Sequence, residues 1–525
     1  MSHARRIALV FAFVAPAALV AQGSTNSNPA SRPPQVGPAQ GTVIVVGGGA
    51  MGPEIYAKFI EAAGGPSALI IDVPTAGGDS VYGQDAPGTR GWKQAGARNV
   101  YVLHTTDRKL ADSDSFAAVV AKAGGVWFEG GRQYHLVDSY AGTKTERAFH
   151  DVLARGGVVG GSSAGASILG DFLVRGAPSN NNFIMDDPGY EKGFAFLRGV
   201  GIDQHVVARE RLPDLADSIV PRYPNLLGIS EDEGTAWVVR GDTAMIIGRN
   251  KAFVYGAKDA NDEGKPFLTL YPGDRFNLAT RRVSHRAADD SPIRAAFVDS
   301  LFSRFGSPAA GGATVLVARD GEVLIDKSYG IPAQPRYMPT TTVPQFALGD
   351  ISQVFRALCT QLPEQPAGRR GGAPTTDSPQ GRGGRGGRGA SAGTPFQSCV
   401  TRRISTPIGM HKTTADSAGQ VHSDVDELYR LALGLENPRT YTRNPTPNDA
   451  SEAAQPVDYA SGWDTDSYHG TSRYSAFVAA GGKRGGFVRV PAQRATVIVL
   501  TNDDGFDARS AANAILDRLM NDQKR

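Results

Sequence analysis

Short apolar runs separated by helix-like segments organise residues 41–285. The runs lie at 43–46, 69–73, 100–103, 126–129 and 158–160, and helices are expected between them at 54–63 and 113–123. Apolar strands that alternate with helices are typical of a sheet buried on both faces. The pattern therefore predicts an α/β domain with a mostly parallel sheet flanked by helices, and functional residues at the carboxyl ends of its strands.

A different pattern begins near residue 313. Apolar runs flank Asp320-Gly321 within 314–326, which predicts a β-hairpin. Further strands are expected at 486–491 and 496–502, followed by a terminal helix at 508–520. We predict a second, α+β domain over 313–525, joined through a helix and linker at 286–312, because 525 residues are too many for one hydrophobic core.

The turn after the fifth apolar run carries the first candidate for chemistry. Its pattern Gly161-x-Ser163-x-Gly165 has the spacing of a nucleophile elbow, in which a serine is pushed out of a tight strand-to-helix turn. Glycines flank such a serine because a Cβ would clash there. The alternative is a turn of small residues that only packs a helix on a strand.

A histidine that can serve this serine lies downstream. His205 is one of only nine histidines and stands between Asp203 and the pair Arg209 and Arg211. Imidazole titrates in the range needed to remove a serine proton, and arginine presents paired donors to carboxylates. The alternative for the arginines is a solvated charged loop.

Taken together, these segments resemble the cyanophycinase and aspartyl dipeptidase family of serine peptidases. The resemblance implies a class I glutamine amidotransferase-like fold. It spans about residues 41–285 in seven ordered blocks, which are 43–51, 71–76, 126–133, the Ser163 turn, the His205 segment, 229–236 and 271–275.

The resemblance implies roles for individual residues. Ser163 matches the nucleophile and His205 the general base, while either Asp203 or Glu233 orients the imidazole. The backbone amides of Gly131 and Ala164 match the oxyanion hole. The substrate-binding positions are Gln133, Gln204, Arg209 and Arg211. The resemblance implies no cofactor and no metal, and a peptide substrate rich in aspartyl residues, with cyanophycin as the family's signature substrate.

Two departures from the family pattern concern the substrate. Asp214 stands where cyanophycinases usually have a third arginine, and Arg132 stands where they usually have an aspartate. The alternatives are therefore an aspartyl dipeptidase of other specificity, or a non-catalytic binding protein built from two inert hydrolase folds. The glycine-rich run 47–52 also admits a nucleotide loop, but it lacks the Lys-Ser/Thr of a phosphate-binding loop.

The second domain resembles the serine β-lactamase and penicillin-binding-protein fold. Pro407-Ile408-Gly409-Met410, Thr413-Thr414 and the segment 422–428 add to this match. The nucleophile motif of that fold, Ser-x-x-Lys, is replaced by Asp350 and Gln353. Ser352 is an alternative nucleophile, but Phe355 follows it at the lysine position. We predict a degenerate, inactive copy that serves binding, shielding, oligomerisation or scaffolding.

An Arg/Gly-rich insert at 364–394 interrupts this domain and is expected to be disordered. A polyanionic partner is the alternative to a solvated loop. The chain's two cysteines, Cys359 and Cys399, bracket the insert. We expect them to form a disulfide, which the chain-entropy model values at roughly 4 kcal/mol for a loop of this length.

The N-terminus predicts export. Residues 1–21 combine Arg5 and Arg6 with an apolar stretch and read as a secretory signal peptide, followed by a flexible lead-in at 22–40. A secreted or periplasmic protein without membrane attachment after signal removal is expected. The net charge is +3, and the loss of two arginines with residues 1–21 leaves +1, which argues against a nucleic-acid partner. A homodimer is an open alternative.

Overall fold

The computed structural model describes most of the chain beyond its N-terminus. The described residues are 34–179, 184, 187–291, 293–306, 311–330, 345–362, 393–436, 461–478 and 484–521. Residues 35–525 form one compact unit. The predicted signal peptide, most of the lead-in and nearly all of the Arg/Gly-rich insert lie outside the described residues. The predicted boundary at 286–312 lies inside the compact unit and stays a prediction.

Five parallel strands form the centre of the N-terminal region, which we define as residues 41–285. They lie in the order β1-β5-β4-β2-β3. All five match predicted runs and are β1 Thr42–Val46, β2 Leu69–Val73, β3 Asn99–Val102, β4 Gly125–Phe128 and β5 Val158–Ser162. The five strand predictions are confirmed.

Antiparallel strands extend this sheet beyond β1. The added strands are β9 Thr235–Arg240, β10 Thr243–Gly248, β13 Arg275–Asn277 and β14 Arg282–His285. The prediction of a mostly parallel sheet therefore holds only for the five strands β1-β5-β4-β2-β3 and not for the rest of this sheet. A two-residue connection such as that from β9 to β10 is too short for a parallel crossover, so these strands must pair antiparallel.

A second sheet carries the next part of the N-terminal region. Its order is β12-β11-β8-β7-β6, in which β6, β7 and β8 run parallel. The bounds are β6 Gly170–Leu173, β7 Leu197–Gln204, β8 Leu227–Glu231, β11 Ala252–Tyr255 and β12 Leu268–Leu270.

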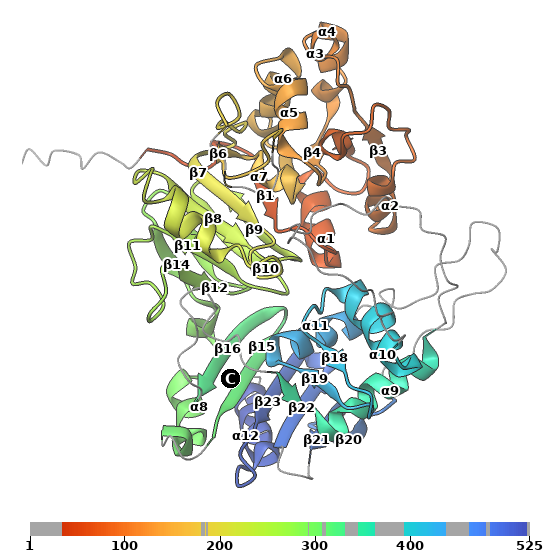
Figure 1. Ribbon diagram of the computed structural model, residues 1–525, viewed down its shortest axis with the longest axis vertical. Helices are drawn as coiled ribbons and strands as arrows, with labels where there is room; N and C mark the ends of the chain where they lie inside the picture. Colours follow the sequence, from red (N-terminus) through yellow and green to blue (C-terminus); the bar gives the residue numbers. More distant parts are fainter. Residues whose placement is uncertain are drawn as a thin grey trace, which may run out of the picture. The chain divides into compact units, whose positions relative to one another are not determined.

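Alternate residues of β1 face two different cores. Val43 and Val45 belong to one apolar cluster together with Phe149, and Ile44 and Val46 to another together with Phe59. The main helices of this region are α1 Pro53–Ala62, α2 Pro87–Gln94, α5 Gln133–Tyr140 and α6 Lys144–Ala154, with the short α3 Arg108–Ala111 and α7 Ala164–Ser167. Figure 1 shows helices packed around the parallel strands. The sheet is thus covered on both faces, as predicted.

The helix predicted at 113–123 is shorter than expected. It consists of α4 Asp114–Ala117 and a 3₁₀ turn at Val120–Lys122. The β-branched residues Val119 and Val120 stand at the interruption, and such side chains disfavour helix.

The C-terminal region, residues 311–521, is built on an antiparallel sheet. Its order is β16-β15-β23-β22-β21-β20, with bounds β15 Ala313–Arg319, β16 Glu322–Tyr329, β20 Asp464–Tyr468, β21 Thr471–Val478, β22 Arg484–Val490 and β23 Ala495–Thr501. Asp320 and Gly321 both have positive φ (54° and 84°), which a two-residue hairpin turn requires. The predicted hairpin and the terminal helix, α12 Ala508–Met520, are confirmed.

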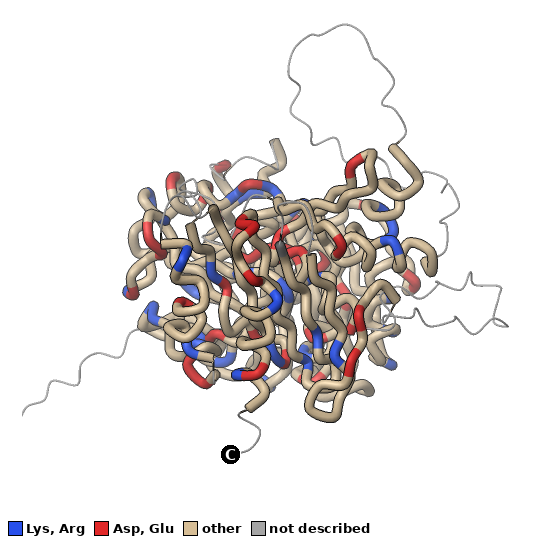
Figure 2. The backbone as a smooth tube through the Cα atoms, turned by 90° about the horizontal axis from the view of Figure 1, so that it is seen from below, with Lys and Arg blue, Asp and Glu red and all other residues tan. Residues whose placement is uncertain are grey.

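Helices and a small sheet complete the C-terminal region. They are α9 Ser352–Gln361, α10 Pro395–Cys399, α11 Val425–Glu436 and the strands β17 Phe346–Ala347, β18 Thr414–Ala415 and β19 Val421–Ser423. Helix α8, Ala295–Leu301, precedes this region as predicted. Among the described helices, none has the length and apolar character to cross a bilayer. Figure 2 shows acidic and basic residues interspersed along the chain.

A disulfide joins Cys359 of α9 to Cys399 of α10, as predicted, with their Cα atoms 5.9 Å apart. Thr394 caps α10, since its side chain accepts from the N–H of Gln397 while the Gln397 side chain accepts from the N–H of Thr394. Residue 394, which the sequence placed at the end of the insert, therefore belongs to the start of α10.

Candidate active site

Ser163 lies on a strained turn between β5 and α7. Its φ is 56°, an unusual value for a residue with a side chain. A Cβ on Gly161 would lie 2.2 Å from the carbonyl oxygen of Gly165, and one on Gly165 would lie 2.0 Å from that of Phe128. Both glycines are therefore required by close backbone approach, and the predicted elbow is present.

His205 follows the end of β7 and reaches Ser163. Its Nε2 lies 2.8 Å from Ser163 Oγ, and its Nδ1 lies 2.5 Å from Glu233 Oε1. A carboxylate only accepts hydrogen bonds, so Nδ1 carries the proton and Nε2 is left to accept from the serine hydroxyl. A serine, a base and an orienting acid are thus aligned for nucleophilic catalysis.

Asp203, the other acid expected to orient His205, is engaged elsewhere. Arg175 donates to both of its oxygens, from Nε at 2.8 Å and from Nη2 at 2.6 Å. Asp203 Oδ1 also accepts from the N–H of Gln204. The expectation that Asp203 orients His205 is therefore wrong, because a bidentate arginine already occupies this buried carboxylate.

The glycine turn after β1 packs directly against this histidine and acid. A Cβ on Gly48 would lie 2.1 Å from His205 Cε1, and one on Gly49 would lie 2.6 Å from Glu233 Oε2. The main chain adds to the contact, since the N–H of His205 donates to the carbonyl of Gly47 at 3.0 Å. The turn therefore serves close packing at this site, and the nucleotide-loop alternative does not match this geometry.

The two amides expected to form the oxyanion hole lie near Ser163. The N–H of Ala164 opens helix α7, and Gly130, which precedes Gly131, is placed so that a Cβ would meet Ser163 Cβ at 3.3 Å. Gly131 has a φ of 144° and no room for a Cβ, which would lie 2.0 Å from the carbonyl oxygen of Ala76. Neither amide donates to another described residue. Both can therefore serve a substrate oxygen.

The predicted substrate-binding residues differ in accessibility. Gln133 is 1% exposed, and its Nε2 has no partner among the described residues. Arg211 is 9% exposed and donates to Gln204 Oε1 at 3.3 Å, while Gln204 contacts Ser167 Oγ at 3.4 Å. Arg209 is exposed. The structure therefore corrects the expected arginine pair, because only Arg209 is open to a substrate carboxylate.

The two departures from the family pattern differ in whether their charge is paired within the protein or exposed. Asp214 forms an ion pair with Arg175, the same arginine that holds Asp203. Its charge is thus largely compensated within the protein. Arg132 is exposed at the start of α5, one residue after Gly131. Of the two departures, Arg132 is the one whose charge is open to solvent.

The electrostatics of the site favour a neutral base. Burial lowers the pKa of His205 more than the hydrogen bond to Glu233 raises it, and the positive charges of Arg209 and Arg211 lower it further. Burial by itself would raise the pKa of Glu233, but hydrogen bonds from His205 and His411 outweigh this effect and hold it well below its usual range. At neutral pH an unprotonated imidazole therefore faces an ionised carboxylate.

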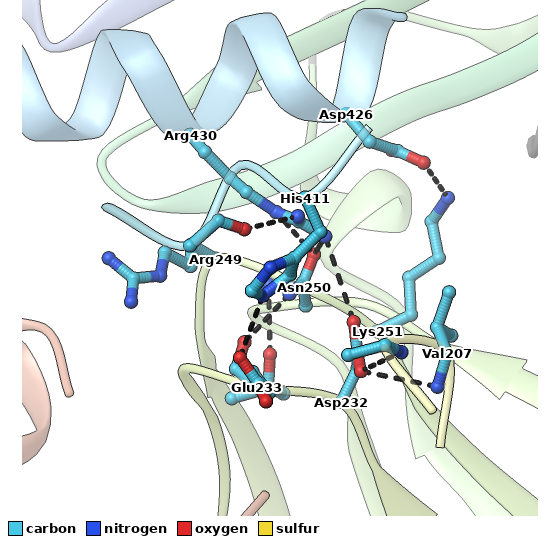
Figure 3. A network of polar contacts seen from close by, with 12 residues as sticks. Val207, Asp232, Glu233, Arg249, Asn250, Lys251, His411, Asp426 and Arg430 are labelled. Atoms are coloured by element: carbon cyan, nitrogen blue, oxygen red, sulfur yellow. Dashed lines mark hydrogen bonds and ion pairs between the residues drawn. The ribbon is translucent and has the colours of Figure 1, made fainter. Parts of the chain in front are cut away.

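His411 is the contact that the sequence did not reveal. It comes from the C-terminal region, between the quoted segments 407–410 and 413–414, and its Nε2 lies 2.7 Å from Glu233 Oε2. Figure 3 shows this contact within a polar network between the two regions, in which Arg430 approaches Asn250 and Lys251 meets Asp426. No group of three or more potential metal ligands occurs among the residues that the structure describes.

Comparison with known proteins defines the class. Residues 43–247 match the sequence model of peptidase family S51. The cyanophycinase of Synechococcus elongatus is 29% identical over 273 residues, which cover 47% of this chain and 82% of that protein. The cyanophycinase of Geminocystis herdmanii is 29% identical over 263 residues, covering 46% and 95%. A solved peptidase from an acI-B1 actinobacterium is 22% identical with a TM-score of 0.35, covering 46% of this chain and 97% of that chain.

Residues 43–247 thus match peptidase family S51, and this match together with the cyanophycinase relatives indicates that the chain is a serine-type peptidase. The resemblance inferred from the N-terminal blocks is confirmed over these residues. The matches favour an enzyme over a non-catalytic binding protein.

Proposed function

We propose that this peptidase is an exopeptidase that hydrolyses cyanophycin or related aspartyl peptides through an acyl-enzyme on Ser163. The observation that carries the proposal is the line of contacts from Ser163 Oγ to His205 Nε2 at 2.8 Å and from His205 Nδ1 to Glu233 Oε1 at 2.5 Å. The relatives named cyanophycinase support the substrate class.

In the proposed mechanism, Ser163 Oγ attacks the scissile carbonyl carbon while His205 Nε2 accepts the serine proton. The N–H groups of Ala164 and Gly131 stabilise the negative oxygen of the tetrahedral intermediate. His205 then returns its proton to the leaving amine, which leaves an acyl-enzyme. A water, deprotonated by the same imidazole, releases the acyl group and restores Ser163.

Two exposed arginines that are close in sequence to catalytic residues support an acidic substrate. Arg209 and Arg132 are both exposed, and each lies close in sequence to a catalytic element, Arg209 after His205 and Arg132 after Gly131. A guanidinium binds a carboxylate through two parallel donors. Because Arg132 departs from the family pattern, aspartyl peptides other than cyanophycin are the second candidate substrates.

The test is release of β-Asp-Arg dipeptides from purified cyanophycin by the wild type, with Ser163→Ala beside it. Release by the wild type alone would support nucleophile, reaction and substrate together. If neither protein releases dipeptides but a fluorophosphonate probe labels Ser163, the peptidase assignment stands and cyanophycin is rejected as substrate. A panel of aspartyl dipeptides then decides the second candidate.

We also propose that the enzyme is exported, on the basis of the signal-like residues 1–21. Expression of the full chain in a bacterial host, followed by N-terminal sequencing of the mature protein, tests this. A mature N-terminus near residue 22 outside the cytoplasm is expected, and an intact Met1 in the cytoplasm would refute it.

For the C-terminal region we propose a degenerate fold of the serine β-lactamase and penicillin-binding-protein type. Asp350 and Gln353 offer neither an activated hydroxyl nor an amine at the positions of Ser-x-x-Lys. Chromogenic β-lactam and ester substrates should therefore show no turnover by Ser163→Ala protein, and any residual turnover would contradict the proposal.

A further inference from the structure

Both oxygens of the Glu233 carboxylate are bound by histidines. Oε1 lies 2.5 Å from His205 Nδ1, and Oε2 lies 2.7 Å from Nε2 of His411, which is 178 residues away in the sequence. The Glu233 side chain is only 13% exposed, so water has little access to compete for it. One carboxylate therefore connects the general base to the C-terminal region.

The loop that carries His411 is itself held in place. Glu427 of α11 is 1% exposed and accepts from three consecutive amides, those of His411 at 3.3 Å, Lys412 at 3.1 Å and Thr413 at 3.1 Å. Arg430 donates to Glu427 at 2.6 Å and to the carbonyl oxygen of Gly409 at 2.7 Å. Charge-assisted bonds to several backbone groups fix the position of this loop.

The same helix also reaches the backbone of Glu233. Arg430 Nε donates to Asn250 Oδ1 at 2.8 Å, and Asn250 Nδ2 donates to the carbonyl oxygen of Glu233 at 2.7 Å. Helix α11 thus connects to Glu233 twice, through His411 to the side chain and through Asn250 to the main chain (Figure 3).

A buried ion-pair cluster secures the contact between the two regions. Lys251 Nζ lies 3.0 Å from Asp326 and 2.7 Å from Asp426, with all three side chains largely buried. Burial of three charges is tolerated only when their geometry is satisfied. A displacement of the C-terminal region would leave these charges unpaired, so the placement of His411 is energetically enforced.

We propose that His411 is a positioning residue for the peptidase reaction, which holds Glu233 in the orientation that aligns His205 with Ser163. The inference rests on the proposed role of Ser163 and His205. A carboxylate bound on one oxygen only can rotate about its side-chain bonds, whereas donors on both oxygens fix its plane. The role assigned to the C-terminal region is therefore to complete the active site.

The charges around His411 determine how the site responds to pH. On the N-terminal region His411 faces Glu233, with Arg249 close to the neighbouring Gly409, and on α11 it faces Glu427 and Arg430. The hydrogen bond to Glu233 raises the pKa of His411 despite its partial burial. Nε2 can donate in both protonation states, so the positioning contact persists across this titration.

Charge at His411 also affects the base. A protonated His411 offsets part of the negative charge of Glu233. Replacing His411 with an uncharged residue therefore makes the electrostatic potential at His205 more negative. The pKa of His205 should then rise, and the acid limb of kcat/KM should move to higher pH. A purely structural role for His411 would change stability without this shift.

The test compares His411→Ala and His411→Gln with a matched control, His422→Ala. His422 lies in the same region, on β19, and pairs with Asp416 rather than Glu233. We expect His411→Ala to lower the rate of fluorophosphonate labelling of Ser163 and kcat by about 10- to 100-fold with KM little changed. His411→Gln, which keeps a donor, should recover most of this loss. Both His411 variants should show the acid-limb shift, and His422→Ala neither effect.

The proposal would be overturned if His411→Ala and His422→Ala were labelled at equal rates and if their kcat/KM values fell at the same acidic pH. A fall in labelling that is matched by thermal unfolding at the assay temperature would point to a structural role instead. If the wild type itself is not labelled, the proposed function fails, and an NMR titration of His205 still decides the inference. A raised His205 pKa in His411→Ala supports the coupling, and an unchanged one refutes it.

Discussion

The two regions each place a serine at a turn that leads into a helix, and the surroundings of the two serines differ. Ser163 follows β5 with a φ of 56°, and His205 Nε2 lies 2.8 Å from its hydroxyl. Ser352 opens α9, is 3% exposed, and its Oγ accepts from the N–H of Val421 at 3.1 Å and from Gln420 at 2.8 Å. A hydroxyl that accepts two buried hydrogen bonds, and that contacts no histidine through a hydrogen bond within the described part of the chain, serves structure.

The two acids near His205 teach the same lesson. Asp203 is two residues from the histidine, yet both of its oxygens are bound by Arg175. Glu233 is 28 residues away and makes the contact at 2.5 Å. In both comparisons, a suitable residue type at a suitable position in the sequence does not by itself make a residue catalytic. The hydrogen-bond partners of the side chain decide its role.

Replacing the two serines should give the largest contrast. Ser163→Ala removes the nucleophile and should lower kcat by at least about 10³-fold with the fold intact, whereas Ser352→Ala should leave kcat unchanged. Hydrolysis of an aspartyl peptide by matched amounts of folded protein measures this. Comparable losses in both variants would remove the distinction between the two serines.

The two acids give the next largest contrast. Glu233→Gln leaves His205 without a carboxylate at Nδ1 and should lower kcat on the order of 10³-fold. Asp203→Asn instead weakens a buried ion pair with Arg175, so it should lower the free energy of unfolding by about 3 kcal/mol. Each folded molecule of Asp203→Asn should keep more activity than a folded molecule of Glu233→Gln. Denaturant unfolding together with kcat of the folded fraction separates the two effects.

The pH dependence should follow the lowered pKa of His205. A general base works only when unprotonated, so kcat/KM should fall as the pH drops through a midpoint below the usual value of about 6.5. Arg209→Gln removes a positive charge that lowers this pKa, so the midpoint should rise.

Because Arg209 is exposed, the difference between wild type and Arg209→Gln should shrink in high salt, which screens surface charges. Profiles of kcat/KM at low and high ionic strength check both statements. A midpoint that moves to lower pH in Arg209→Gln would contradict the assigned direction.

Much of the fold was predictable because its signals are local. The five parallel strands are continuous apolar runs, the elbow is a glycine pattern, and the hairpin at Asp320-Gly321 is a turn pattern. The antiparallel extension of the first sheet was not predicted, because only the start of β9 lies in a recognised block, 229–236, and β10 lies in none.

The acid and His411 escaped for a different reason. His205 has a φ of 56°, so the chain turns away from the direction of β7, and closeness in sequence to Asp203 does not bring the two side chains together. His411 is 178 residues from Glu233, and their contact depends on how α11 packs beside Asn250. No periodicity or spacing in one sequence encodes such a contact.

The smallest effect concerns the stability that Ser352 provides. Loss of its hydroxyl leaves the buried N–H of Val421 and the amide of Gln420 without this acceptor, although Gln420 also contacts the carbonyl oxygen of Val421. Ser352→Ala should therefore lower the free energy of unfolding by about 1–3 kcal/mol. Denaturant unfolding of this variant beside Ser163→Ala measures the difference.

Since Ser163 is partly exposed and held in a strained conformation, its replacement should cost less stability than that of Ser352. The serine that matters for chemistry would then be the one that matters less for folding, and the reverse order would refute this assignment of roles.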